Sequence, residues 1–94
     1  MCGFVAFLAN GSSLAERQPL MKQMLSSISH RGPDGEGLHH VAGQALFGHR
    51  RLAVIDIEHG AQPMLTSDQR YSLVFNGEIY NYQEIRKELE QQGC

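Results

Sequence analysis

The chain has 94 residues, a net charge of -2, and a composition of 41% apolar and 19% charged residues. This length accommodates one small domain, and the composition is typical of a globular protein with a packed core. A weakly acidic chain with scattered basic residues is poorly suited to bind nucleic acid or acidic membranes. The longest apolar run, Gly3 to Ala9, is too short to cross a bilayer and lacks the features of a secretory signal, so we expect a cytoplasmic protein.

The residues that commonly bind metals or form disulfides are dispersed. Cys2 and Cys94 stand at opposite ends of the chain, without the CxxC spacing of zinc or redox motifs. None of the five histidines has a metal-ligand spacing with a carboxylate on a recognisable helix face. The sequence therefore predicts neither a disulfide framework nor a metal site.

The first half of the chain predicts a strand, a helix and a hairpin. The apolar run of residues 4–8 predicts a buried strand that ends in an Asn10-Gly11 turn. Ser13 to Glu16 has capping-box spacing, but Pro19 favours a helix that begins at the proline itself. The apolar face of that helix is formed by Leu20, Met21, Met24, Leu25 and Ile28.

A loop over His30–Gly35 should end this helix, because it contains Pro33 and two glycines. Residues 37–41 and 45–49 flank an Ala42-Gly43-Gln44 turn and predict a hairpin. Further strands are expected over 51–57 and 71–75, separated by a polar, turn-rich stretch.

A second helix is expected from Asn81, which has capping-box spacing to Glu84, to a stop at Gly93, with Ile85 and Leu89 on one face. Strands that follow one another without intervening helices argue against a doubly wound parallel sheet. We therefore expect an α+β fold with a mixed or antiparallel sheet.

Cys2 could combine a thiol and a base in one residue. Removal of Met1 would leave a free α-amine on Cys2, and this amine is far less basic than lysine, so it can accept the thiol proton near neutral pH. Ordinary packing of a buried cysteine is the alternative, and a Cys2–histidine pair is a second way to activate the thiol.

Two further segments carry residues suited to substrate binding. Arg50 and Arg51 precede an apolar stretch; a guanidinium there could hold a carboxylate through two hydrogen bonds, although solvated surface charge is the alternative for each. Asn76-Gly77 follows another apolar stretch and could form either a hairpin turn or an oxyanion hole made by the Asn76 amide and the Gly77 N–H.

Five segments in this order together resemble the N-terminal glutaminase domain of asparagine synthetases, within the class II glutamine amidotransferases. The segments cover essentially the whole chain and are Met1-Cys2-Gly3, His30-Arg31-Gly32-Pro33-Asp34, His49–Asp56, Gln62-Pro63-Met64 and Asn76-Gly77-Glu78-Ile79-Tyr80-Asn81. The resemblance implies the αββα sandwich of N-terminal-nucleophile hydrolases, of which residues 1–94 would form the N-terminal part.

Position by position, the resemblance implies a role for each matching residue. Cys2 becomes the nucleophile, Arg51 the clamp on the α-carboxylate of glutamine, and Asn76 with Gly77 the oxyanion hole. The loop from Arg31 to Asp34 becomes supporting structure, and Arg50 keeps its interpretation as surface charge. The remaining glutamine-pocket residues are Glu78 and, through their main chain, Leu52, Ala53, Val54 and Ile55.

The implied reaction is hydrolysis of glutamine through a Cys2 thioester. The ammonia would pass to a C-terminal synthetase domain, absent here, that uses ATP and Mg²⁺ to amidate aspartate; a homodimer is compatible with this family. The acidic residue that binds the α-amino group of glutamine is expected beyond Cys94, so we expect the 94-residue piece alone to be weakly active or inactive. Two alternatives are a noncatalytic interaction module of the same fold and an amidotransferase with another carboxylate acceptor.

Overall fold

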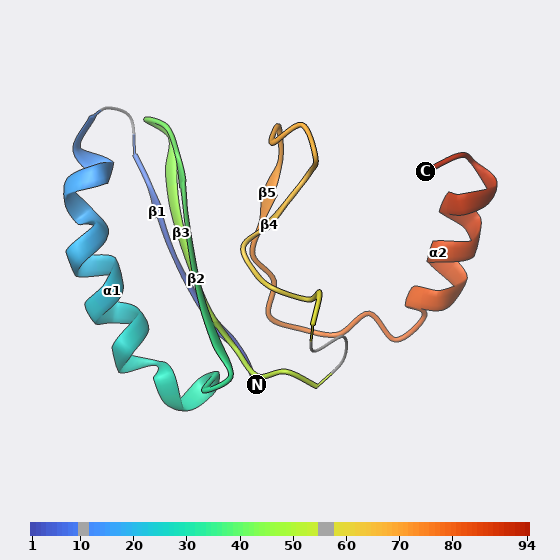
Figure 1. The fold of residues 1–94 in the computed structure, drawn as a ribbon, viewed down its shortest axis with the longest axis horizontal. Helices are drawn as coiled ribbons and strands as arrows, with labels where there is room; N and C mark the ends of the chain where they lie inside the picture. Colours follow the sequence, from blue (N-terminus) through green and yellow to red (C-terminus); the bar gives the residue numbers. More distant parts are fainter. Residues whose placement is uncertain (10–11, 55–57) are drawn as a thin grey trace.

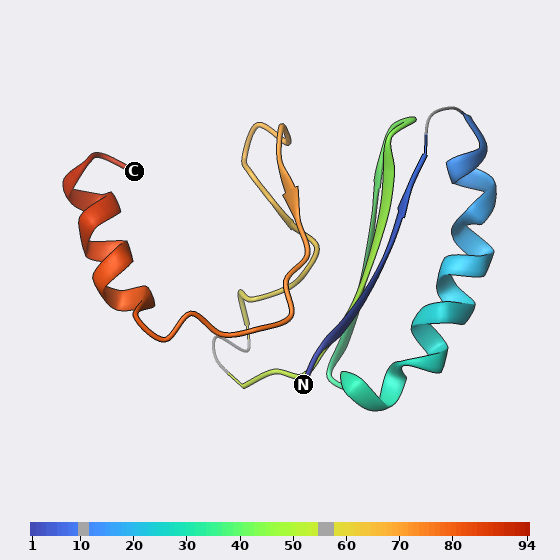
Figure 2. The same cartoon turned by 180° about the vertical axis from the view of Figure 1, so that it is seen from behind.

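The structure is a computed structural model that describes residues 1–9, 12–54 and 58–94 (Figure 1). Its elements are β1 (Gly3–Leu8), the 3-10 turn η1 (Ser12–Arg17), α1 (Gln18–Ser27), the 3-10 turn η2 (Ser29–Arg31), β2 (Gly35–Val41), β3 (Ala45–Arg51), β4 (Met64–Leu65), β5 (Ser72–Leu73) and α2 (Tyr82–Gln91). Figures 1 and 2 show α1 along one side of the larger sheet, the β4–β5 hairpin on the other, and α2 set apart.

The larger sheet is antiparallel, with strand order β1-β3-β2. In its register, His49 on β3 lies opposite Phe4 on β1 and Gly37 on β2. The turn between β2 and β3 contains Gly43 at φ +69°, a conformation that glycine adopts readily. The β4–β5 hairpin is a second antiparallel sheet. The prediction of an α+β fold with a mixed or antiparallel sheet is confirmed, the sheets being antiparallel. The predicted hairpin is confirmed too, and it is two residues longer in each strand at its open end.

The core lies between α1 and the sheet. Gly48 allows α1 to approach closely, since a Cβ there would lie 2.7 Å from Leu25 Cδ1 and 2.8 Å from Met21 Sδ. Among the described residues, the fully buried apolar side chains are those of Leu14, Met21, Leu25 and Leu46. The predicted start of α1 near Pro19 is confirmed, but its buried face is narrower than predicted, because Leu20 and Met24 are exposed.

The burial of β1 alternates along the strand. Phe4 and Leu8 are exposed, whereas Val5 and Phe7 pack against the core. The prediction of a strand here is confirmed, but the prediction that it is buried throughout is wrong. Because α1 covers one face of the sheet, only every second residue of β1 reaches the core.

The strand predicted over 51–57 is wrong for residues 52–54. β3 ends at Arg51, and residues 52–54 lie outside any strand because the backbone of Leu52 and Ala53 bonds to Cys2 and Asp34 instead. Residues 55–57, and the Asn10-Gly11 turn, lie outside the described residues. The strand predicted over 71–75 is confirmed only for the two residues of β5, and the N–H of Phe75 bonds to the Gln62 side chain and not to a strand. The short strand β4 was not predicted.

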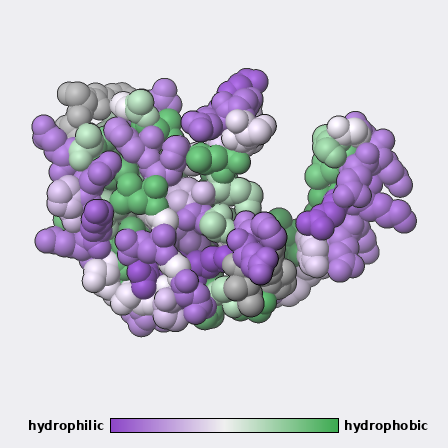
Figure 3. All heavy atoms as spheres, in the orientation of Figure 1, coloured by the Kyte–Doolittle hydropathy of each residue, from purple (hydrophilic) through white to green (hydrophobic). Residues whose placement is uncertain are grey.

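The second helix occupies the predicted place. Asn81 is the residue before α2, but its side chain makes no capping hydrogen bond, so the predicted capping box does not form. Gly93, at φ +86°, ends the helix as predicted. Figure 3 shows apolar residues on the side of α2 that faces the hairpin, and Ile85 and Leu89 line a shallow groove there. Within the described residues, neither helix is long and apolar enough to cross a membrane.

Candidate active site

The sulfur of Cys2 lies against the backbone of Leu52, fifty residues along the chain. The Leu52 N–H donates to Sγ at 3.3 Å, and Sγ lies 3.7 Å from the Leu52 carbonyl oxygen. Figures 1 and 2 show the reason: the N-terminus and the segment that leaves β3 lie side by side at one end of the sheet. A backbone donor directed at a partly buried sulfur can stabilise negative charge that develops on it.

Arg31 holds the backbone of the same cysteine from the other side. Its Nε and Nη2 atoms each donate to the Cys2 carbonyl oxygen at 3.4 Å. Gly3 gives this contact room, because a Cβ at Gly3 would lie 3.1 Å from Ile28 Cδ1 and 3.5 Å from the Cβ of Arg31. The turn after α1 therefore fixes the start of β1.

The loop before β2 fixes the segment that contacts the sulfur. The Asp34 carboxylate accepts a 2.8 Å hydrogen bond from the Ala53 N–H, and the Asp34 N–H donates to the Arg51 carbonyl at 3.0 Å. A Cβ at Gly32 would overlap the backbone of Arg50 and Arg51, so this loop lies directly on the end of β3. It thereby constrains the main chain over residues 51–53.

The two adjacent arginines have different surroundings. Arg50 pairs with Glu36 at 2.8 Å and its side chain is only 16% exposed, so its interpretation as solvated surface charge is wrong. Strand alternation places Arg51 on the opposite face, shared with His49. Arg51 lies close enough for its positive charge to contribute to the lowered pKa of His49.

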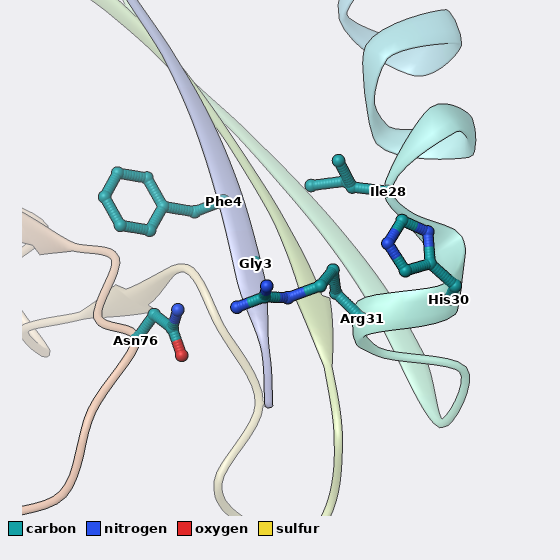
Figure 4. Close-up of a pocket in the computed structure, with 6 residues that line it drawn as sticks. All are labelled: Gly3, Phe4, Ile28, His30, Arg31 and Asn76. Atoms are coloured by element: carbon teal, nitrogen blue, oxygen red, sulfur yellow. The ribbon is translucent and has the colours of Figure 1, made fainter.

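Asn76 lies across from the start of β1. It lines a cavity of about 330 Å³ together with Gly3, Phe4, Ile28, His30 and Arg31. In Figure 4 the Asn76 carboxamide and the Arg31 guanidinium point toward one another beside the first residues of β1. The structure thus brings Asn76 to the end of the sheet where Cys2 lies.

The Asn76-Gly77 segment is not a hairpin turn, because the chain continues from it to α2. Gly77 packs beneath the Phe75 ring, where a Cβ would lie 2.8 Å from Phe75 Cζ. Glu78 and Val54 are exposed. Ile55 lies outside the described residues.

Gln62 and His49, neither of which was predicted to be a site residue, hold the segment before Asn76. The side-chain amide of Gln62 pairs with the Phe75 backbone, accepting from its N–H at 2.6 Å and donating to its carbonyl at 3.0 Å. His49 Nε2 lies 3.2 Å from the same carbonyl and, as an N–H, donates to it. The only sequence signal for a role of these two residues was that each lies in one of the segments that resemble the family. Their contacts with Phe75 join segments that are far apart in the chain.

His49 is buried with one unsatisfied nitrogen. It is 0% exposed, and Nδ1 has no hydrogen-bond partner in the described part of the chain. Burial lowers the pKa of His49, the bond to Phe75 opposes this, and the charge of Arg51 adds to the lowering. A neutral ring with its proton on Nε2 fits these surroundings. Across residues 1–9, 12–54 and 58–94, no three His, Cys, Asp or Glu side chains are grouped as metal ligands.

Comparison with known proteins gives a consistent result over the whole chain. A family model described as a glutamine amidotransferase domain matches residues 1–94. The chain is 47% identical over 95 residues to a glutamine-hydrolysing asparagine synthetase of Bacillus subtilis and 42% identical over 98 residues to a second one from that organism. A probable asparagine synthetase of Dictyostelium discoideum is 42% identical over 96 residues. These matches cover 99% of this chain but only 15–16% of each relative.

Proposed function

The chain belongs to the glutamine amidotransferase domain family, and from this premise we propose that it is the glutaminase segment of an asparagine synthetase, with Cys2 as the nucleophile. The α1 layer and the β1-β3-β2 sheet would then be the N-terminal part of an αββα sandwich of the N-terminal-nucleophile type. The relatives show the family to which the chain belongs, and the contacts around Cys2 support the proposed mechanism.

The observation that carries the proposal is the position of the Cys2 sulfur. It lies at the end of a strand, 3.3 Å from the Leu52 amide, at the sheet end where Asn76 lines a cavity. A nucleophile needs an accessible face, a fixed backbone and donors directed at developing charge. Arg31 and the Asp34 loop fix the backbone on both sides of this sulfur.

The reaction begins after removal of Met1. The α-amine of Cys2 takes the thiol proton, and the thiolate attacks the side-chain amide carbon of glutamine. The carbonyl oxygen becomes an oxyanion, which the Asn76 amide and the Gly77 N–H stabilise. The ammonium returns the proton to the leaving nitrogen, the C–N bond breaks, and ammonia departs from a thioester. Water then attacks the thioester with the amine as base, releasing glutamate and the thiol.

Substrate binding is assigned to the residues around this sulfur. Arg51 would bind the α-carboxylate of glutamine through two hydrogen bonds, a geometry that lysine cannot provide. The other residues assigned to the glutamine pocket are Glu78 and the main chain of Leu52, Ala53, Val54 and Ile55.

The rest of the reaction lies outside these residues. The chain spans about 15% of the length of its curated relatives. In the proposal, a C-terminal synthetase domain uses ATP and Mg²⁺ to amidate aspartate with the released ammonia, in a cytoplasmic enzyme that forms homodimers. No residue described here is assigned to ATP or Mg²⁺.

The test uses the protein expressed from its full native reading frame. We expect a mass that lacks Met1, and a glutaminase activity that Cys2→Ala abolishes and Cys2→Ser reduces at least about 100-fold. Cys94→Ala is the matched control, since Cys94 is exposed and distant in sequence, and it should retain full activity. Full activity in Cys2→Ala would overturn the mechanism, and an intact Met1 without activity would favour a noncatalytic module.

A further inference from the structure

We propose that His49 is a positioning residue for the glutaminase reaction: together with Gln62, it clamps the Phe75 backbone and so sets the place of the Asn76 and Gly77 donors. This inference rests on the proposed function. It concerns two side chains that do not touch the reacting atoms but hold a segment that does.

The clamp consists of three hydrogen bonds to the two peptide groups that flank Phe75. Gln62 satisfies the N–H and shares the carbonyl, while His49 Nε2–H donates to that carbonyl from the sheet. Phe75 directly precedes Asn76. A fixed carbonyl at Phe75 therefore fixes the peptide plane that leads into the oxyanion donors.

The sheet provides the rigid base for this clamp. His49 lies in the middle strand, paired with β1 and β2 on either side, and its side chain is completely buried. On β2, the residue paired with His49 is Gly37, where a Cβ would overlap the Gln62 carbonyl oxygen. The absence of a side chain at Gly37 thus lets the Gln62 backbone rest on the sheet beside His49.

The register also links the clamp to the nucleophile. Phe4, two residues after Cys2, is the partner of His49 on β1. The Cys2 sulfur and the Phe75 carbonyl are therefore both positioned by the paired strands β1 and β3. This pairing keeps the distance and orientation between the nucleophile and the oxyanion donors constant. A displacement of about 1 Å in such an arrangement costs roughly 100-fold in rate.

Three variants test the donor role of His49. His49→Leu removes the donor at similar volume, and we expect kcat for glutamine hydrolysis to fall about 10- to 100-fold with KM changed less than about 3-fold. His49→Gln can place an amide N–H near the position of Nε2 and should recover most of this loss. The matched control is His40→Leu, a partly buried histidine of the same sheet that alternation places on the α1 face; it should keep wild-type kcat.

A ligand test separates positioning from general structural damage. The γ-aldehyde analogue of glutamine adds to Cys2 and mimics the tetrahedral intermediate, so its affinity depends on the oxyanion donors. In His49→Leu we expect this affinity to fall in proportion to kcat/KM, whereas binding of glutamate stays within about 3-fold. A protein that fails to fold would lose both.

The outcomes distinguish this inference from the proposed function. If Cys2→Ala keeps glutaminase activity, the proposed function fails. If Cys2 is essential but His49→Leu keeps wild-type kcat, or loses aldehyde and glutamate affinity equally, the positioning role fails alone. Gln62→Leu gives a second check: because both side chains bind one carbonyl, the effects of the two substitutions on kcat should be less than multiplicative, and independent multiplicative effects would contradict a shared clamp.

Discussion

The amide nitrogen of Leu52 lies 3.3 Å from the sulfur of Cys2, although fifty residues separate them. This contact joins the first residue before β1 to the first residue after β3. It explains why β3 ends where it does, since the Leu52 N–H is used by the sulfur and not by a neighbouring strand.

Arg51 and Arg50 should respond differently to substitution. We expect Arg51→Ala to raise KM for glutamine at least about 100-fold, because a charged two-point contact to the α-carboxylate is lost. Arg51→Lys should recover only part of that affinity. Arg50→Ala removes the ion pair with Glu36 and should leave KM within about 3-fold. Steady-state kinetics of glutamine hydrolysis measure KM for the Arg51 and Arg50 variants. Equal effects at the two positions would contradict the assignment of Arg51 to the α-carboxylate of glutamine.

Asp34 should act through the backbone that it holds. Asp34→Ala removes the acceptor of the Ala53 N–H, so we expect kcat/KM for glutamine to fall about 10-fold and the melting temperature to drop, consistent with a loss of about 1 kcal/mol. Asp34→Asn keeps an acceptor oxygen and should stay within about 3-fold of wild type. Thermal unfolding and glutaminase assays test this, and an equal loss in both variants would indicate that the carboxylate charge matters instead.

Two glycines on β2 provide a matched pair. A Cβ at Gly37 would overlap the Gln62 carbonyl, whereas a Cβ at Gly35 would meet only the Cβ of Arg51 at an ordinary 3.7 Å. We therefore expect Gly37→Ala to lower kcat about 10-fold or more by displacing the Gln62 segment, and Gly35→Ala to have little effect. Amide hydrogen exchange at Phe75 should accelerate in Gly37→Ala alone. Unchanged exchange and kcat in that variant would show that the segment can shift without consequence.

The pH dependence of stability should contain a contribution from His49. Its pKa is lowered in the folded protein, chiefly by burial, while the unfolded chain has the ordinary histidine value of about 6.5. As the pH falls below about 6.5, the unfolded chain takes up the proton first, so the free energy of unfolding decreases. Above this pH the ring is neutral in both states and the contribution is constant.

NMR titration of the His49 ring should give a midpoint below about 6.5, with the proton of the neutral form on Nε2. The decrease in melting temperature between pH 7.5 and 5.5 should be smaller in His49→Gln than in wild type. A His49 midpoint above that of an exposed histidine would contradict the inferred neutral donor.

Local signals in the sequence sufficed for the elements that depend on neighbouring residues. Pro19 marked the start of α1 because its ring suits a first helical turn, and Gly43 marked the β2–β3 turn because that turn needs a positive φ. Cys2 could be named as a candidate from its own amine and thiol, but only the family motifs favoured the nucleophile interpretation over ordinary packing of a cysteine. Asn76 could be selected because the motif that contains it matched a family.

Contacts between distant segments could not be predicted in the same way. The apolar run after Arg51 has the composition of a strand, yet the hydrogen bonds that would extend β3 go to Cys2 and Asp34. Likewise, His49 and Gln62 bind the Phe75 backbone from 26 and 13 residues away in the sequence. No local sequence pattern predicts contacts of this kind. Leu14 enters the core because η1 packs against α1. The apolar pattern that predicted a helix begins at Pro19, so it did not include η1.

The position of Met1 bears on how the enzyme would be matured. Met1 is 74% exposed, and strand pairing in the sheet begins only at Gly3. Cleavage of the first peptide bond therefore breaks no strand pairing and opens no hole in the interior. In the proposed mechanism, an aminopeptidase would therefore not have to disrupt the sheet to free the α-amine of Cys2, and removal of Met1 could precede or follow acquisition of the native structure.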